Sequence, residues 1–411
     1  MAVLGFGSYR VSIKSEKHRE ALEYALDSGC RVIDTSSNYT NGDSEKLIGK
    51  VLEGSSFNPI VISKAGYIQG DNLDRISSSL SKDIVNISDS LKHSIHPRFL
   101  EDQLERSLER MGLKFIDIYL LHNPEYYLKE KGSTKDEYYR RIKQAFLFLE
   151  EQVKLGKIKA YGISSNTFID PKDDHESTDI VEVYKLASSI DNHSFKYIQF
   201  PLNLLELGAL ERQFDGDHLI EKAHALGLKT IINRPLNAFT ENGLVRLANY
   251  SFDEKLTDEF AELFFVEKVE TIVNKWENDK DEGDESLFEI PLFKQISNIW
   301  YKQNSKDAVD QIFHSHLFPF VASIWGSSLS ASESQPFYEL YEKACEYALK
   351  NMDKRANQFK QVAINQGLLF ESDQNLSLMA IEKYAAFGVD IILVGMKEKK
   401  YVEELKSFFT L

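Results

Sequence analysis

The sequence lacks the features that are typical of secreted proteins, of membrane-spanning proteins and of proteins with a structural metal site. Only two cysteines occur, Cys30 and Cys345, far apart and without metal-ligand spacing. They indicate neither a disulfide framework nor a zinc site, and a reduced cytoplasmic compartment is expected. No apolar run approaches the roughly 18 residues of a membrane span. The stretch 1–12 has no basic region followed by an apolar one, so no signal peptide is predicted.

Positive charge is also scarce. The chain has 49 lysines and arginines against 64 acidic residues, which gives a formal net charge of −15. Without a basic stripe, nucleic acid is not an expected partner, and an anionic ligand would need a local basic patch. His314 and His316 have no acidic or cysteine partners at ligand spacing, so no metal site is predicted. The composition, 42% apolar and 27% charged, is that of a globular enzyme with a large core.

Short apolar runs alternate with helical patterns along most of the chain. Eight such runs are predicted as strands, and each is followed by a helix or a helix-containing segment. Near-continuous apolar strands in this alternation predict an α/β fold, an eight-stranded parallel (β/α)8 TIM barrel. The predicted strands are 3–7, 31–34, 60–63, 115–121, 160–163, 197–200, 229–232 and 390–394.

One long segment, about 238–375, interrupts this alternation after the seventh strand and shows only helical patterns. A typical barrel needs about 250 residues, so this segment accounts for most of the surplus length. We therefore expect one barrel domain over 1–411 with a large, mainly helical insertion within it. The insertion leaves from the carboxyl end of a strand, where such barrels hold their active sites. It is equally consistent with a lid, a substrate-pocket wall or a dimerisation element, and the oligomeric state is not predicted.

Polar side chains stand at the ends of consecutive predicted strands. Asp34 and Tyr39 follow the second strand, Lys64 the third and His122 the fourth. Each alone has a structural explanation, as a helix cap, an amphipathic core residue, a surface charge or a satisfied core histidine. Because the carboxyl ends of parallel strands meet at one face of a barrel, the four together favour a single site.

The motifs around these residues resemble those of the aldo-keto reductases. RVIDTSSNYTNGDSEKLIG, VISK and YLLHNPE resemble the family's aspartate–tyrosine, lysine and histidine stretches, and KLGKIKAYGISSN and YIQFPLNLLE resemble its fifth and sixth strands. The resemblance covers about 3–237 and 376–411. It implies that Asp34, Tyr39, Lys64 and His122 form a complete catalytic tetrad.

These residue types suit hydride transfer to a carbonyl. Charge develops on the oxygen and needs a proton donor and hydrogen bonds. Tyr39 is expected to be the general acid/base, with Lys64 pulling its pKa from about 10 toward neutrality. Asp34 is expected to hold Lys64 by a partly buried salt bridge, and His122 to orient the carbonyl.

The cofactor is inferred from the resemblance alone, because no GxGxxG turn opens the chain. The resemblance implies a nicotinamide cofactor, with NADP(H) preferred and NAD(H) possible. Four positions depart from the family pattern or have two explanations. Ser165 replaces a usual asparagine, and Asn233 replaces an aromatic ring. Arg234 is expected either at the pyrophosphate or in a structural salt bridge, and Lys397 either at the 2′-phosphate or at a solvated helix start. The expected cofactor-binding residues are Gly7, Ser8, Ser164, Ser165, Asn166, Gln199, Arg234, Leu236, Gly395 and Lys397.

Tyr9, Tyr67 and Tyr126 lie just beyond strand ends and are expected either to line a substrate pocket or to pack. The predicted function is an NADP(H)-dependent oxidoreductase acting on an aldehyde, ketone or sugar carbonyl, with a small-molecule carbonyl or alcohol as partner. One alternative is a cofactor-binding barrel that regulates or binds a partner protein through its insertion. Another is an aldose dehydrogenase that works in the oxidative direction.

Overall fold

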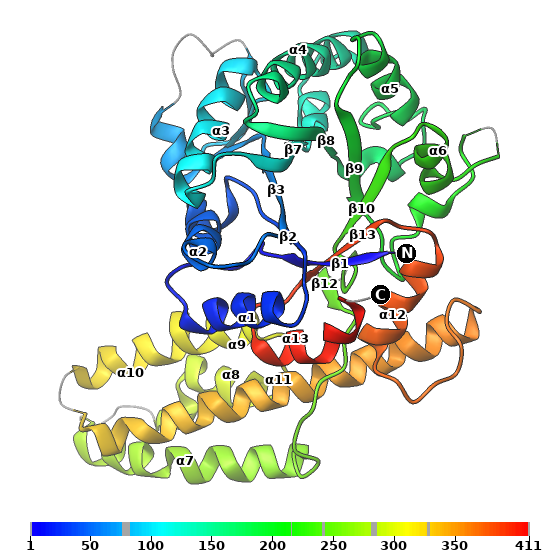
Figure 1. The fold of residues 1–411 in the computed structure, drawn as a ribbon. Coiled ribbons are helices and arrows are strands. Elements are labelled where there is room, and N and C mark those ends of the chain that lie inside the picture. The colour runs from blue at the N-terminus through cyan, green and yellow to red at the C-terminus, as the bar shows by residue number, and fades with distance from the viewer. Residues whose placement is uncertain are drawn as a thin grey trace. The chain divides into compact units, whose positions relative to one another are not determined.

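A closed barrel of eight parallel strands forms the first compact unit of the chain (Figure 1). The computed structural model describes residues 2–75, 83–214, 216–240, 243–280, 286–326 and 329–409. The strands follow one another around the barrel in the order β1-β13-β10-β9-β8-β7-β3-β2. The predicted (β/α)8 fold is therefore confirmed. The strands are β1 (Val3–Gly7), β2 (Val32–Asp34), β3 (Ile60–Ala65), β7 (Ile116–His122), β8 (Ile158–Ser164), β9 (Phe195–Pro201), β10 (Lys229–Asn233) and β13 (Ile391–Gly395).

Helices follow the predicted alternation and begin at recognisable caps. The Asp179 carboxylate, for example, accepts a hydrogen bond from the Val181 amide at 2.7 Å at the start of α5. α4 begins well before the predicted 146, because its first turns are polar and only Thr134 marks their start. The helices of this unit are α1 (Glu16–Asp27), α2 (Asp43–Leu52), α3 (Pro97–Met111), α4 (Lys135–Lys154), α5 (Ile180–Ser188), α6 (Leu219–Ala225), α12 (Leu376–Ala386) and α13 (Lys399–Leu405).

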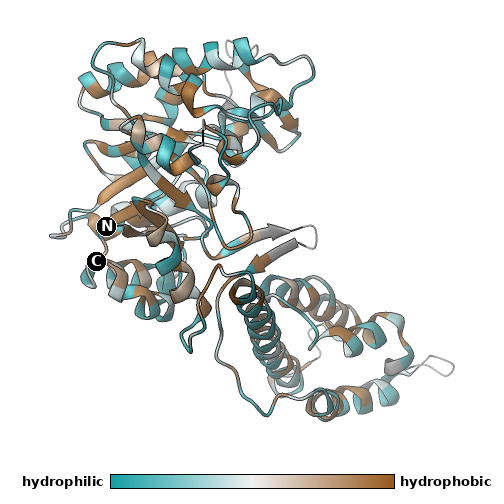
Figure 2. Ribbon diagram, turned by 90° about the vertical axis from the view of Figure 1, so that its right-hand side faces the viewer, coloured by the Kyte–Doolittle hydropathy of each residue, from teal (hydrophilic) through white to brown (hydrophobic). Residues whose placement is uncertain are grey.

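Aliphatic side chains fill the barrel and leave its rim polar. A buried cluster joins strands from all around the barrel: Val32, Ile62, Ile118, Leu120, Ile231, Ile391 and Leu393. Figure 2 shows the apolar colour concentrated on the strands, whereas the surrounding helices carry both colours. Burying these residues removes several hundred Å² of apolar surface from water at roughly 25 cal/mol per Å². The packed interior holds the strand ends in fixed register.

Two small sheets were not predicted from the sequence. After β3, strands β4 (Tyr67–Gln69), β5 (Val85–Ser88) and β6 (Leu91–His93) form an antiparallel sheet in the order β4-β6-β5. After β10, β11 (Asn237–Thr240) pairs with β12 (Gly243–Arg246). These strands span only three or four residues each, too few for hydrophobic alternation to show. The first sheet matters for the site because it carries Tyr67 and His93.

The second compact unit, Arg246–Ser377, is helical and has a core of its own. Trp300 is fully buried in it, with its ring 5.4 Å from that of Tyr347 and 6.2 Å from that of Phe265. The unit has the helical character expected of the insertion, for which the sequence predicts the range of about 238–375. Its main helices are α7 (Asp258–Asp279), α8 (Pro291–Ile299), α9 (Lys306–Ile312), α10 (Phe318–Trp325) and α11 (Ala331–Asn365). Within the ranges that the structure describes, no helix is long and apolar enough to cross a membrane.

Candidate functional site

The predicted catalytic residues lie on neighbouring strands at the carboxyl-terminal rim of the barrel. Asp34 ends β2, Lys64 lies in β3 and His122 ends β7. Parallel register pairs Lys64 with Leu120 and His122 with Ser164 on the next strands. Barrel closure therefore brings residues from distant parts of the sequence together, as the analysis of strand ends predicts.

A buried ion pair joins Asp34 and Lys64. The Lys64 ammonium lies 2.6 Å from Asp34 Oδ1, and the lysine side chain is fully buried. Lys64 also donates to the Thr35 carbonyl at 2.8 Å. Burial raises the pKa of Asp34 and lowers the pKa of Lys64, while each partner's charge opposes that shift. The expected Asp34–Lys64 salt bridge is present, and it is more deeply buried than expected.

Tyr39 meets this ion pair through its hydroxyl group, which accepts a hydrogen bond from Lys64 Nζ at 3.4 Å. The chain turns sharply just after the tyrosine, where Thr40, Asn41 and Gly42 all have positive φ. Asn and Gly tolerate that region, whereas it strains a β-branched threonine. The strained turn begins α2 and fixes the direction from which Tyr39 enters the site.

Burial raises the pKa of Tyr39 well above its ordinary value, and the Asp34 carboxylate and Tyr9 raise it further. This result contradicts the expectation that Lys64 pulls that pKa toward neutrality. The physical reason is that the Lys64 charge is largely neutralised by Asp34 at 2.6 Å, so desolvation of the phenolate outweighs it. In this arrangement Tyr39 is a neutral phenol at physiological pH and can donate a proton.

His122 is held by two residues that the sequence analysis did not identify. Its Nδ1 lies 3.0 Å from Ser36 Oγ. His93 Nε2 donates to the His122 carbonyl oxygen at 2.7 Å, and a side chain at Gly66 would place its Cβ only 2.2 Å from that oxygen. Burial and the Lys64 charge hold the pKa of His122 well below its ordinary value, so the ring is neutral. The position of Ser36 between Asp34 and Tyr39 in the sequence could have indicated that it belongs to the site. No sequence pattern indicated His93.

Aromatic rings surround His122. The Tyr67 ring lies 4.7 Å from that of His122 and 5.3 Å from that of Tyr126, both edge-on. Tyr67 OH accepts a hydrogen bond from Asn123 Nδ2 at 2.6 Å. Tyr9 is 65% exposed, and its ring meets the Tyr39 ring edge-on at 5.2 Å. Tyr67 and Tyr9 therefore contact the catalytic candidates His122 and Tyr39, whereas Tyr126 packs against Tyr67 and His93. The role of all three toward a substrate stays a prediction.

Ser164 and Gln199 form a polar pair beside Asp34. Ser164 Oγ donates to Gln199 Oε1 at 2.7 Å, and Gln199 Nε2 donates to Asp34 Oδ1 at 3.2 Å. The serine keeps its acceptor lone pairs and the amide keeps a second proton. Nearby at the end of β10, the buried Asn233 Oδ1 has no hydrogen-bonding partner. A primary carboxamide offers one acceptor and two donor protons, so Ser164 and Gln199 fit a nicotinamide carboxamide.

Other expected cofactor residues have structural hydrogen bonds. Ser8 is fully buried and donates to the Asp34 carbonyl at 2.7 Å. Ser165 Oγ accepts from the Thr167 amide at 3.1 Å and so caps a short 3₁₀ helix, and the Asn166 amide donates to Glu125 at 2.9 Å. These contacts hold the loops after β1 and β8, and any contact with a cofactor stays a prediction.

Arg234 forms the structural salt bridge that was one of its two expected roles. Its Nη2 lies 2.8 Å from Glu206 Oε1, and its backbone has a positive φ of 54°. Leu236 is half-buried just after it. Gly7 ends β1 and Gly395 ends β13, and the two residues are paired in register on these adjacent strands. Because neither residue has a side chain, the backbone of both strands is uncovered at this part of the rim. Lys397 follows β13 and is half-buried.

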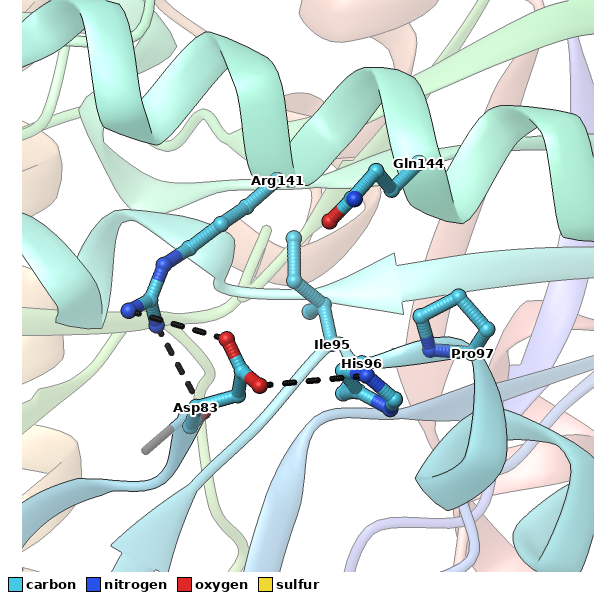
Figure 3. Close-up of a pocket in the computed structure, with 6 residues that line it drawn as sticks. All are labelled: Asp83, Ile95, His96, Pro97, Arg141 and Gln144. Carbon is cyan, nitrogen blue, oxygen red and sulfur yellow. Dashed lines mark hydrogen bonds and ion pairs between the residues drawn. The ribbon is translucent and has the colours of Figure 1, made fainter. Parts of the chain in front are cut away.

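A small cavity elsewhere on the barrel unit has a structural role. It is lined by Asp83, Ile95, His96, Pro97, Arg141 and Gln144, and its volume is about 10 Å³ (Figure 3). That space holds no more than about one water molecule. Arg141 Nη1 donates a hydrogen bond to the Asp83 carbonyl oxygen at 3.4 Å. The cavity therefore lies beside a contact between α4 and the segment before β5. No predicted site residue lines it.

No group of three or more potential metal-ligating side chains occurs among the residues that the structure describes.

Comparisons with known proteins agree on one family. The family model described as "Aldo/keto reductase family" matches residues 3–281. The D-threo-aldose 1-dehydrogenase of a Pseudomonas species is 30% identical over 171 residues, 39% of this chain and 49% of that protein. The NADH-specific methylglyoxal reductase of Escherichia coli (strain K12) is 26% identical over 139 residues, 33% of this chain and 37% of that protein. The chain thus spans about half the length, or less, of these curated relatives.

Among solved structures, the glycerol dehydrogenase of Gluconobacter oxydans is similar in fold. The match has a TM-score of 0.50 and 15% identity, and it covers 99% of this chain and 86% of that one. At this identity the likeness supports the fold alone.

Proposed function

The chain belongs to the aldo/keto reductase family, and from this premise we propose that it is a nicotinamide-dependent oxidoreductase that transfers a hydride to or from a carbonyl carbon. One observation carries the proposal. The Lys64 ammonium is bonded to Asp34 on one side and to the half-buried Tyr39 hydroxyl on the other, and both members of the ion pair are buried. A phenol attached to a buried cation is a proton donor and acceptor suited to a carbonyl oxygen.

In the reductive direction Tyr39 gives its proton to the carbonyl oxygen. Because its pKa is raised, the phenol carries that proton at physiological pH. As the proton leaves, negative charge develops on the tyrosine oxygen, 3.4 Å from the Lys64 ammonium, which stabilises it. Asp34 keeps the ammonium in place, and His122 orients the substrate. In the oxidative direction the same phenolate takes the proton back.

The cofactor supplies or accepts the hydride at the substrate carbon when it is bound. Ser164 and Gln199 would hold its carboxamide, since the serine keeps acceptor lone pairs and the glutamine amide keeps a second proton beyond the bonds they already make. NADP(H) is the preferred form, with Lys397 at the 2′-phosphate. NAD(H) stays possible, and a relative named for NADH specificity supports keeping it in the test.

The proposed substrates are aldehydes, ketones and sugar carbonyls. The match to a D-threo-aldose 1-dehydrogenase supports a second candidate function, oxidation of an aldose by the same residues. Equilibrium and cofactor ratio would determine the direction, because proton transfer at Tyr39 is reversible. A cytoplasmic location belongs to the same proposal and rests on composition.

The test is fluorescence titration of the full chain with NADPH and, separately, with NADH, followed by turnover on a panel of aldehydes, ketones and aldoses. Tyr39→Phe is expected to bind the cofactor like the wild type and to lose turnover by about a hundredfold or more. Tyr119→Phe is the matched control, because its buried hydroxyl has no hydrogen-bonding partner and its loss should leave turnover unchanged.

Two results would overturn the proposal. Full activity of Tyr39→Phe would remove the proposed acid, and failure to bind either cofactor would remove the reaction itself. In the second case the helical unit, Arg246–Ser377, would become the place to seek a regulatory or partner-binding role.

A further inference from the structure

Thr40, the residue after Tyr39, has a backbone conformation that does not suit its side chain. Its φ is 47°, in the left-handed region, where a branched Cβ is sterically unfavourable. Glycine adopts that region without strain, and asparagine tolerates it. Thr40 is also exposed, so core packing does not explain a threonine there. Strain that persists at an exposed position indicates a contact that offsets it.

The Thr40 hydroxyl makes such a contact. Its Oγ1 donates a hydrogen bond to the Val11 carbonyl oxygen at 2.6 Å. Val11 lies in the loop after β1, where its side chain is buried and its amide donates to the Ser8 carbonyl oxygen at 3.0 Å. The bond therefore attaches the strained residue to a loop that is itself held in place. Glycine, which would relieve the strain, has no group that could form this bond.

The same loop is also attached to the end of β2. The Ser8 amide and the Ser8 Oγ donate to the Asp34 carbonyl oxygen at 3.0 and 2.7 Å. The loop thus bridges the two ends of the segment 34–40. The carboxylate of the buried ion pair stands at one end of this segment, and the phenol of Tyr39 stands near the other. With both ends held, the 3.4 Å separation between the Tyr39 hydroxyl and the Lys64 ammonium is constrained.

We propose that Thr40 is a positioning residue, whose hydroxyl bond to Val11 holds the Tyr39 phenol against the Lys64 ammonium for proton transfer. The inference rests on the proposed function and gives a role within it to a residue outside the expected site. A displacement of about 1 Å can reduce a reaction rate by about a hundredfold. The loop keeps other attachments, such as the bond from Ser44 Oγ to Ser8 Oγ at 2.7 Å. Loss of the Thr40 bond should therefore have a smaller effect.

Three variants separate the hydroxyl group from the strain. Thr40→Val keeps the branched shape without the hydroxyl, Thr40→Ser keeps the hydroxyl, and Thr40→Gly removes both the hydroxyl and the strain. We expect Thr40→Val and Thr40→Gly to lose kcat by about tenfold with an unchanged dissociation constant for NADPH. Thr40→Ser should keep the wild-type kcat. Wild-type kcat in Thr40→Val, or a Thr40→Ser variant as slow as Thr40→Val, would refute the inference.

Stability measurements separate positioning from a general loss of structure. Thr40→Gly should unfold at a higher urea concentration than Thr40→Val, because only glycine relieves the strain. Hydrogen exchange of the β7 and β8 peptides in a urea series measures this difference. The two variants should nevertheless be equally slow in turnover. If kcat recovered in Thr40→Gly together with stability, the bond to Val11 would not be what positions Tyr39.

Thr230→Val is the matched control. It removes a threonine hydroxyl that donates to Asp390 Oδ2 at 2.9 Å, near the amino end of β10. The site lies at the opposite ends of the strands. We therefore expect Thr230→Val to lose stability and to keep the wild-type kcat. An equal loss of kcat in Thr230→Val and Thr40→Val would mean that the effect of Thr40 is only structural.

Failure of this inference is distinguishable from failure of the proposed function. Without urea, hydrogen exchange of the peptide 35–42 reports on the Thr40 bond whether or not the protein turns over. We expect faster exchange in Thr40→Val and Thr40→Gly than in the wild type and Thr40→Ser. If the wild type binds no cofactor and reduces no carbonyl, the proposed function is wrong, and the exchange result still decides whether the hydroxyl holds the segment. If turnover is normal and exchange is equal in all four proteins, the inference alone is wrong.

Discussion

Removing one member of the Asp34–Lys64 ion pair should destabilise the barrel with a pH dependence that depends on which member is removed. Lys64→Met leaves a carboxylate at a 4% exposed position, where, among the residues that the structure describes, only the Gln199 amide at 3.2 Å remains as a side-chain donor. Breaking a buried pair in this way costs about 3–5 kcal/mol near neutral pH. Typical domains have only about 5–15 kcal/mol of stability, so the effect is large enough to measure.

The sign of the pH dependence follows from the direction of each shift. Burial raises the pKa of Asp34, and in Lys64→Met nothing opposes it. The folded state then binds more protons than the unfolded one, so relative to the wild type the variant loses stability as pH rises from about 4, the pKa of an unfolded aspartate. The loss stops once pH exceeds the folded pKa.

Asp34→Asn should behave in the opposite way. Burial lowers the pKa of Lys64, and the variant removes the carboxylate that opposes this shift. The folded state now binds fewer protons than the unfolded one. Relative to the wild type, the variant therefore gains stability as pH rises from the lowered pKa toward about 10.4, the value of an unfolded lysine.

Hydrogen exchange of the β2 and β3 peptides in a urea series measures these differences. Tryptophan fluorescence is unsuitable, because all three tryptophans, Trp276, Trp300 and Trp325, lie in the helical unit. The double variant Asp34→Asn/Lys64→Met buries no charge and should be more stable than either single variant. If both single variants showed the same pH slope, or none, the reasoning from a buried ion pair would be refuted.

Three further changes have defined outcomes. Gly66→Ala places a Cβ 2.2 Å from the His122 carbonyl oxygen, so we expect a loss of about 1–3 kcal/mol in urea unfolding and reduced kcat. Arg110→Met removes the guanidinium that lies 2.5 Å from the buried Glu45 carboxylate. We expect the variant to lose about 3–5 kcal/mol of unfolding free energy, measured by hydrogen exchange of α2. Burial raises the pKa of Glu125 to about 7. The wild type should therefore lose on the order of 3 kcal/mol relative to Glu125→Gln as pH rises toward 7, measured by urea unfolding at each pH.

Each of these has a control. Gly54→Ala meets no atom within 4 Å, so only backbone strain should appear, without loss of kcat; equal kcat loss in both glycine variants would contradict the steric argument. Adding Glu45→Gln to Arg110→Met should restore stability, and no restoration would mean that the charge is not the cause. A flat pH difference for Glu125→Gln would mean that the carboxyl titrates at its ordinary value.

The approach of Ser36 and His93 to His122 shows where prediction from the sequence ends. Both side chains contact His122 from segments that the barrel brings beside it, and His93 lies on a short strand that was not predicted. Hydrophobic period and turn residues report only on a residue's neighbours in sequence. They carry no information on a hydrogen bond between Ser36 and His122, 86 positions apart.

The sequence by itself determined the alternation of strands and helices, and hence the parallel barrel with polar residues at its strand ends. These are local signals, set by apolar period and capping residues. Only the tertiary structure decided the protonation of Tyr39 and the partners of His122. A pKa depends on how completely atoms from distant segments exclude water, and that packing raised the pKa of Tyr39 where its neighbouring lysine alone predicted the reverse.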